Sequence, residues 1–184
     1  IDTAMGRAQE LFAKRVKDDS KRPEVAARLV SDLDGDGVGK ADLLIEAIIE
    51  RPDAKRDLYA SLEPKMQAGA ILGTNTSSIM LETLATGLAD SGRLVGLHFF
   101  NPVARMPLVE VIHGEATRPE VLQAAINFTR QIDTLPLPCK SAPGFVVNRI
   151  LIPYMIEATL LAEEGVPLAL IDQAATDFGM PMGP

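Results

Sequence analysis

The sequence predicts an α/β fold, in which a doubly wound sheet is followed by the start of an all-helical domain. Short apolar runs alternate with amphipathic stretches of helical spacing through the middle of the chain, and this alternation is typical of a doubly wound sheet. After the turn-rich "KSAPGF" the alternation stops, and two helical patterns follow each other. We therefore expect a sheet domain over residues 1–140 and a helical domain that starts within residues 141–184.

Each element follows from its local pattern. Apolar residues at helical spacing predict an opening helix that includes Leu11 and Phe12, and Pro23 begins a short helix that runs to Val30. "TLPLPC" predicts an edge strand, because its prolines cannot donate to a ladder. Pro153 is expected to kink the first C-terminal helix or mark its early turn. The other expected strands are 43–49, 70–78, 93–100 and 107–112, and the other expected helices are 53–66, 80–88, 118–132, 146–164 and 167–179.

Composition excludes several classes of function. The chain has 184 residues, 47% of them hydrophobic, with a formal net charge of −7. An acidic protein is not expected to take nucleic acid or an anionic membrane surface as its main partner. One cysteine, Cys139, allows no internal disulfide, and no apolar run is long enough to span a bilayer. Because the sequence begins at Ile1, without an initiator Met, we expect it to be a piece of a longer protein.

Two glycine-rich patterns resemble known ligand loops without matching them. "DLDGDGVGKADL" starts like a calcium loop, but Leu43 stands where that loop needs a bidentate glutamate. A solvated turn fits this segment better. Gly35 and Gly37 have the first spacing of the dinucleotide fingerprint G-x-G-x-x-G, but Lys40 replaces its third glycine, and the segment precedes a strand. A nucleotide-binding fold would thus lack its first strand and phosphate loop here.

The segment "GTNTSS", Gly73 to Ser78, lies where a predicted strand ends. In open α/β sheets, ligands bind at this edge, and small hydroxyl residues there donate hydrogen bonds to a substrate oxygen. The competing interpretation is that these residues cap the helix that follows.

A histidine and a glutamate occupy two of the most apolar runs, "GLHFF" and "LVEVI". A carboxylate among apolar residues is costly unless it is paired. If the two strands are neighbours, Glu110 meets His98, fixes its tautomer and stabilises imidazolium, which is a general-base arrangement. The alternative is a core histidine beside an outward-facing glutamate.

Other polar residues carry weaker signals. Asn148 falls in the first turn of the predicted long helix, where its amide would point at a ligand or simply start the helix. Two histidines and one cysteine, none at ligand spacing, predict no metal site. Cys139 lies beside prolines with no basic partner in sequence, which favours a packed thiol.

Taken together, "IEAIIERPDAK", "GTNTSS", "GLHFFNPVARMPLVEVI", "PGFVVNRILIPY" and "FGMPMGP" resemble the 3-hydroxyacyl-CoA dehydrogenase family of fatty-acid β-oxidation, in that family's order. The resemblance implies an incomplete Rossmann-type sheet that lacks the N-terminal G-x-G-x-x-G unit, followed by the start of the helical dimerisation domain. It also implies NAD-dependent oxidation of an L-3-hydroxyacyl-CoA to a 3-oxoacyl-CoA.

The resemblance also implies roles for individual residues. His98 is the general base and Glu110 its orienting partner. Ser77 and Asn148 hold the reacting oxygen or order the site. The residues implied on the cofactor side are Glu50, Lys55, Ser77 and Asn101.

The resemblance further implies an acyl-CoA substrate and a homo-oligomer formed through the helical segment, with domain swapping as one route. The implied compartment is the bacterial cytoplasm, or the mitochondrial matrix in a eukaryote. We expect the fragment alone to be weakly active or inactive. Two alternatives stay open: a non-catalytic interaction module with a vestigial site, and a dehydrogenase of a related short substrate such as 3-hydroxybutyryl-CoA.

Overall fold

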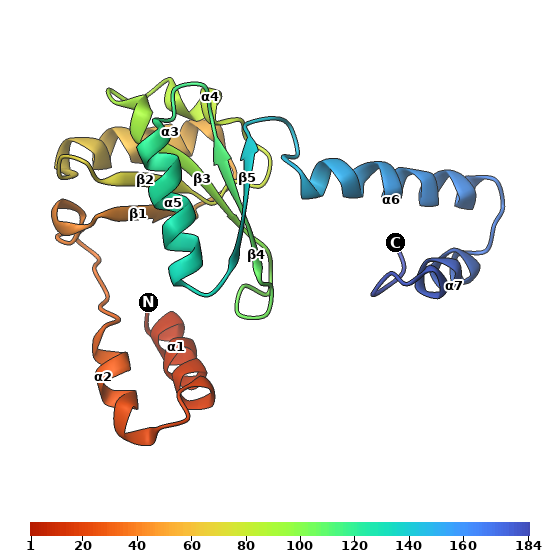
Figure 1. The fold of residues 1–184 in the computed structure, drawn as a ribbon, viewed down its shortest axis with the longest axis horizontal. Helices are drawn as coiled ribbons and strands as arrows, with labels where there is room; N and C mark the ends of the chain where they lie inside the picture. Colours follow the sequence, from red (N-terminus) through yellow and green to blue (C-terminus); the bar gives the residue numbers. More distant parts are fainter. The chain divides into compact units, whose positions relative to one another are not determined.

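The computed structural model describes residues 1–184 and contains one five-stranded sheet (Figure 1). The strands lie side by side in chain order: β1 (Leu43–Glu46), β2 (Ile71–Thr74), β3 (Leu94–Phe99), β4 (Leu108–His113) and β5 (Leu135–Lys140). The first three strands are parallel, β4 runs antiparallel to β3, and β5 is parallel to β4. The predicted α/β class is confirmed, with one antiparallel pair at its centre, and the proline-containing β5 lies at the edge as expected.

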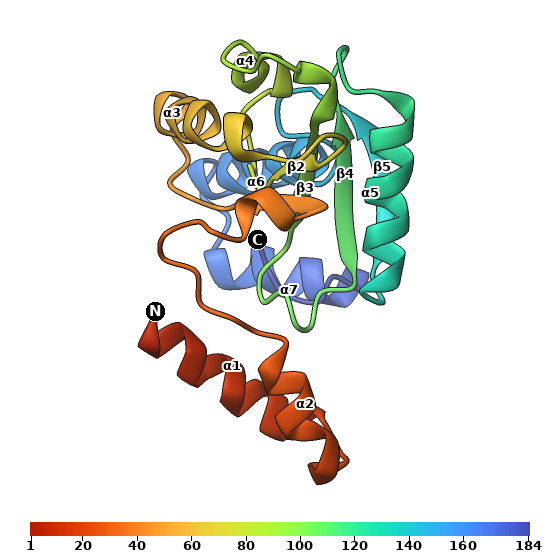
Figure 2. The ribbon, with the colours of Figure 1, turned by 90° about the vertical axis from the view of Figure 1, so that its left-hand side faces the viewer.

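Helices cover both faces of this sheet, as the alternation predicted (Figure 2). α3 (Pro52–Leu62) and α4 (Leu81–Ala85) connect the parallel strands on one face, and α5 (Pro119–Gln131) covers the other. Alternate residues of β3 and β4 point at α5 and form an apolar core with it. That core contains Val95, Leu97, Val109, Val111, Val121, Ala125 and Ile126. Because strand residues alternate between faces, His98 and Glu110 point to the opposite face, away from α5.

The strand predicted over residues 43–49 is too long. β1 ends at Glu46, because the Glu46 carboxylate accepts the backbone N–H of Ile48 at 2.7 Å and turns the chain away from β2. Ile48 and Ile49 are correspondingly exposed, at 42% and 65%.

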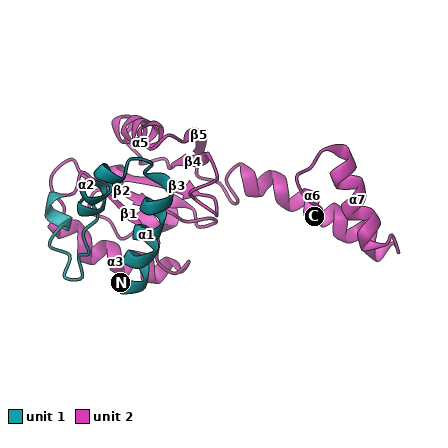
Figure 3. Ribbon diagram, turned by 90° about the horizontal axis from the view of Figure 1, so that it is seen from below, with its two compact units in different colours: residues 1–40 teal, residues 41–184 magenta.

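The chain divides into two compact units, Ile1–Lys40 and Ala41–Pro184 (Figure 3). The first unit holds α1 (Asp2–Arg15) and α2 (Arg22–Ala27), so the second predicted helix ends three residues before Val30. In the acidic loop that follows, the Asp32 carboxylate accepts the backbone N–H groups of Gly35, Asp36 and Gly37. These bonds to Asp32, that of Gly37 foremost, lower the pKa of its exposed carboxyl.

Two helices end the second unit, namely α6 (Val147–Glu163) and α7 (Leu168–Phe178). Pro153 lies inside α6, and much of the apolar surface of both helices is exposed, with Ile150 at 69% and Phe178 at 88%. Neither helix, nor any other in the structure, is long and apolar enough to cross a bilayer. The domain boundary expected between residues 140 and 141 stays a prediction.

Candidate active site

His98 and Glu110 are directly opposite each other on β3 and β4. His98 Nδ1 lies 2.6 Å from Glu110 Oε2, with the glutamate side chain fully buried and the histidine side chain 8% exposed. The alternative of an outward-facing glutamate is therefore wrong. A neutral imidazole that donates Nδ1–H to a carboxylate presents the lone pair of Nε2, the form that a general base needs.

The second oxygen of Glu110 ties the pair to the start of α6. Oε1 accepts the backbone N–H groups of Val146 and Val147, both at 2.8 Å. Positive φ angles at Gly144 (73°) and Phe145 (48°) turn the chain so that these N–H groups face the carboxylate. A helix N-terminus favours an adjacent anion, which offsets part of the cost of burying Glu110.

Aromatic rings surround the imidazole. The ring of Phe100 lies 4.5 Å from that of His98, centroid to centroid, and the ring of buried Phe145 lies 5.8 Å away. These rings keep water away from the pair, which strengthens the interaction between charges as they form.

Ser77 and Asn148 are also brought together, through a contact between the Asn148 side chain and the Ser77 backbone. Asn148 Nδ2 donates to the Ser77 carbonyl oxygen at 3.2 Å, which links α6 to the loop after β2. The Ser77 hydroxyl lies 3.3 Å from Glu50 Oε1. The helix-cap interpretation of this loop is wrong, because α4 begins at Leu81 with Met80 as its N-cap residue and no side-chain cap.

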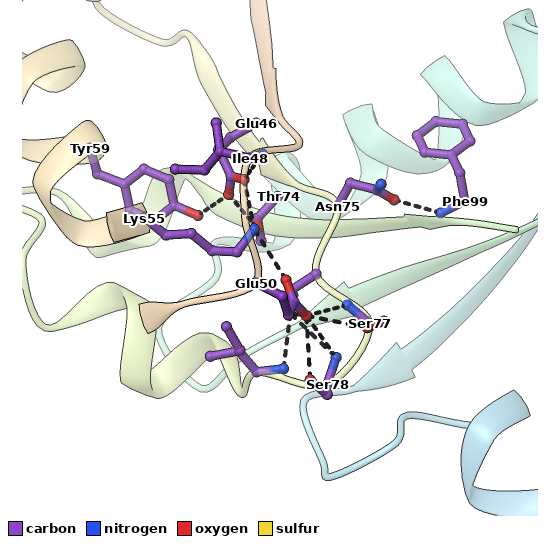
Figure 4. A network of polar contacts seen from close by, with 12 residues as sticks. Glu46, Ile48, Glu50, Lys55, Tyr59, Thr74, Asn75, Ser77, Ser78 and Phe99 are labelled. Atoms are coloured by element: carbon purple, nitrogen blue, oxygen red, sulfur yellow. Dashed lines mark hydrogen bonds and ion pairs between the residues drawn. The ribbon is translucent and has the colours of Figure 1, made fainter. Parts of the chain in front are cut away.

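Glu50 holds the loop in place (Figure 4). Its Oε1 accepts the Thr76 hydroxyl at 2.6 Å, the Ser77 N–H at 2.8 Å and the Ser78 N–H at 3.2 Å. Burial would raise the pKa of Glu50, but the Thr76 hydroxyl, the Ser77 N–H and the Lys55 ammonium outweigh it. The pKa of Glu50 is therefore lowered.

Lys55 is fully buried, with its ammonium 3.3 Å from Glu50 and 2.6 Å from Glu46. Sequence reasoning did not select Glu46, although it carries the same signal as Glu110, a carboxylate inside an apolar run. Asn101, by contrast, is exposed in the turn between β3 and β4 and is not hydrogen-bonded to these residues.

Cys139 on β5 is not an activated nucleophile. Burial first, and then the charge of Glu110, raise the pKa of its thiol to about 11, so that it is protonated at neutral pH. No group of three or more histidine, cysteine, aspartate or glutamate side chains is arranged to hold a metal ion.

The residues present fit one end of a dinucleotide. The Glu50 side chain is 35% exposed and lies with Ser77 beyond the carboxyl ends of β1 and β2, where ligands of such sheets bind. The Lys55 ammonium, in contrast, is engaged by two carboxylates. No G-x-G-x-x-G segment for a pyrophosphate occurs in residues 1–184.

Comparison with protein families identifies the family of the chain. A model described as the 3-hydroxyacyl-CoA dehydrogenase NAD binding domain matches residues 1–142, which defines an NAD-binding domain of dehydrogenase type. A model described as the C-terminal domain of the same enzymes matches residues 144–184. The chain belongs to the 3-hydroxyacyl-CoA dehydrogenase family, as its motifs predicted, and NAD is confirmed as the cofactor of that family.

Individual relatives are longer than this chain. A fatty acid oxidation complex subunit alpha of Psychrobacter sp. is 37% identical over all of the chain, which spans 26% of that relative. A probable 3-hydroxyacyl-CoA dehydrogenase of Caenorhabditis elegans is 46% identical over 80% of the chain, a stretch equal to 50% of the relative.

Solved structures show the same fold. The 3-hydroxybutyryl-CoA dehydrogenase of Escherichia coli K12 superposes on the whole chain with a TM-score of 0.94 and 37% identity, over 40% of its own length. The (S)-3-hydroxybutyryl-CoA dehydrogenase of Ralstonia eutropha gives a TM-score of 0.91 and 32% identity, over 65% of its length.

Proposed function

We propose that the protein oxidises the 3-hydroxyl of an L-3-hydroxyacyl-CoA to a ketone, with NAD as the hydride acceptor, in fatty-acid β-oxidation. The observation that carries this proposal is the buried pair of His98 and Glu110, whose Nδ1 and Oε2 atoms lie 2.6 Å apart. His98 Nε2 takes the hydroxyl proton, and Glu110 stabilises the imidazolium that forms. When bound, NAD supplies the acceptor for the hydrogen on the carbinol carbon.

Ser77 and Asn148 are proposed to hold the reacting oxygen and order the site. The Asn148 amide bonds to the Ser77 carbonyl, so the helix that positions Asn148 also positions the serine loop. Glu50 with Ser77 would contact the nicotinamide and ribose side of NAD, and Asn101 would reach the same side from the exposed turn after β3. Lys55 is buried, so it would influence the cofactor side indirectly, through its ion pair with Glu50.

Burial of the catalytic pair away from water suits this chemistry. His98 is only 6% exposed, and the phenylalanine rings beside it exclude water. Charges that form on the imidazole and carboxylate during proton transfer therefore interact more strongly than they would in water.

The class of substrate is proposed from the family. The length of its acyl chain is proposed from the names of the two solved structures. Both compared solved structures are named as 3-hydroxybutyryl-CoA dehydrogenases, which supports a short acyl chain. A non-catalytic interaction module is the competing function. We favour the enzyme because His98, Glu110, Ser77 and Asn148 are all present and the first two are paired.

The proposed partner is a second copy of the chain, which would bind through α6 and α7. Domain swapping between the copies is one way in which the oligomer could form. The exposed apolar residues of these helices, such as Ile150 and Phe178, support it. The proposed compartment is the cytoplasm in a bacterium and the mitochondrial matrix in a eukaryote, which fractionation of the source cells would test.

The test is reduction of acetoacetyl-CoA by NADH, measured on the longest native chain that contains these residues. Free acetoacetate serves as the control, because it has the same reacting ketone without the thioester and CoA. We expect turnover of the thioester and a loss of at least about 100-fold in kcat/KM with the free acid. Equal turnover of acetoacetyl-CoA and free acetoacetate, or turnover of neither compound, would contradict the proposed function.

A further inference from the structure

A second buried carboxylate lies at the end of β1, and nothing in the proposed reaction uses it. The Glu46 side chain is 1% exposed and receives four hydrogen bonds (Figure 4). Its Oε1 accepts from Ile48 N at 2.7 Å and Lys55 Nζ at 2.6 Å. Its Oε2 accepts from the Tyr59 hydroxyl at 2.8 Å and the Thr74 hydroxyl at 2.9 Å. The Glu46 carboxylate is therefore a fixed, fully satisfied anion.

This anion reaches the site through one cation. The Lys55 ammonium lies between Glu46 Oε1 and Glu50 Oε2, at 2.6 and 3.3 Å. The other oxygen of Glu50 in turn holds the loop that contains Ser77. An unbroken series of contacts thus runs from Glu46 through Lys55 and Glu50 to the Ser77 loop.

Stability alone gives little reason for such a series. A buried ion pair costs desolvation, and apolar residues of the same volume are often as stable. Lys55 is held more closely by the buried Glu46 than by the part-exposed Glu50, so Glu46 fixes where the ammonium lies. The ammonium then fixes the Glu50 carboxylate, which has room to move at the surface.

We propose that Glu46 is a positioning residue that sets the Ser77 loop for the reaction, acting through Lys55 and Glu50. This inference rests on the proposed function for its catalytic consequence, whereas the placement of the loop is measured without activity. Without the Glu46 charge, the Lys55 ammonium is no longer held in one place and no longer fixes the Glu50 carboxylate, so Glu50 releases the backbone N–H groups of Ser77 and Ser78.

Glu46→Gln isolates this charge. A glutamine oxygen can face Lys55 and Ile48, and its amide can face the hydroxyls of Tyr59 and Thr74, which accept as well as donate. The number of hydrogen bonds can then be kept, with the two to Tyr59 and Thr74 reversed in direction, and the charge is lost. Glu63→Gln is the matched control, because the Glu63 carboxylate also accepts two backbone N–H groups, those of Ala89 and Asp90, away from the Ser77 loop.

The first readout is amide hydrogen exchange in the longest native chain. Glu46→Gln is expected to speed exchange at Ser77 and Ser78 about tenfold, which corresponds to a modest loss of local protection. Glu63→Gln is expected to leave those two amides unchanged. Unchanged exchange in Glu46→Gln would overturn the proposal, whether or not the protein proves to be a dehydrogenase.

The second readout is a kinetic cycle with acetoacetyl-CoA and NADH. Glu46→Gln is expected to lower kcat about tenfold with little change in KM, and to cost less than about threefold when Ser77→Ala is already present. Independent, multiplicative losses would show that Glu46 does not act through the Ser77 loop. An inactive unmodified protein would instead contradict the proposed function, and the exchange result would still decide the positioning role.

Lys55→Gln covers the case in which Glu46→Gln does not fold. It removes the charge that joins Glu46 to Glu50 and keeps an amide that can donate to Glu46. Faster exchange at the amides of Ser77 and Ser78 is expected, and unchanged exchange would overturn the proposal.

Discussion

Glu110 satisfies three hydrogen-bond donors with two oxygens, and each donor comes from a different residue. One oxygen faces His98 Nδ1, and the other accepts from Val146 and Val147. If any one donor were removed, the other two hydrogen bonds would remain. The position of the carboxylate therefore does not depend on a single contact. This explains how an ionised group is tolerated at a position with no solvent exposure.

Glu50 gives the residue-scale prediction, because its pKa is lowered in the folded protein by its hydrogen bonds and Lys55. A carboxyl whose folded pKa lies below its unfolded value stabilises the fold above the unfolded pKa of about 4.5. That stability is lost as pH falls through the folded pKa. We therefore expect the urea midpoint of the longest native chain to fall more steeply below about pH 4.5 than that of Glu50→Gln.

The control for this measurement is Glu10→Gln, which removes an exposed carboxylate on α1. Its midpoint should follow that of the unmodified protein across the whole range. If Glu50→Gln shows the same acid dependence as the unmodified protein, Glu50 is not the stabilising anion described here.

The turn before α6 is the element that joins the catalytic pair to the helical segment. Gly144 has a φ of 73°, and a Cβ atom built on it would lie 3.2 Å from Arg149 N. Alanine at this position is therefore strained and shifts the start of α6, so that Val146 and Val147 leave Glu110. Gly165 offers a matched control, because its φ is 94° and no atom lies within 4 Å of a Cβ built there.

The prediction is that both Gly144→Ala and Gly165→Ala lower the free energy of unfolding by about 1 kcal/mol, the usual cost of left-handed backbone. Only Gly144→Ala should also lower kcat, by about tenfold, because it moves the partners of Glu110. Denaturant titration and steady-state kinetics check the two effects. Equal kcat values for the two variants would refute a role of this turn in the site.

Elements were easier to predict than side-chain contacts. All five strands were predicted, four of them from their apolar runs and β5, which has no fully buried residue, as an edge strand from its prolines. The end of β1 was missed, because the Glu46 side chain captures a backbone N–H of its own loop. The cross-strand pairing of His98 with Glu110 could be expected, because two apolar runs joined by a short loop predict neighbouring strands. The Glu46–Lys55–Glu50 contacts could not, although they lie within residues 46–55, because they depend on the path of the loop between β1 and α3, which apolar periodicity does not predict.

At the scale of the whole molecule, the exposed apolar surface of α6 and α7 predicts self-association of the 184-residue chain. Phe178 is 88% exposed and Leu168 is 70% exposed, and such surfaces are usually covered by protein. Sedimentation over a range of concentrations should show a dimer or a larger species. A monodisperse monomer at every concentration would exclude the proposed partner.

The most direct test of the central claim is a comparison of the two histidines of this chain. In the longest native chain, His98→Asn is expected to lower kcat for acetoacetyl-CoA reduction by NADH at least about 100-fold, because the proton-transfer group is lost. His113→Asn, at the end of β4 and outside the pair, should keep the kcat of the unmodified protein. Equal activity of His98→Asn and His113→Asn would contradict the assignment of His98 as the general base, and with it the proposed mechanism.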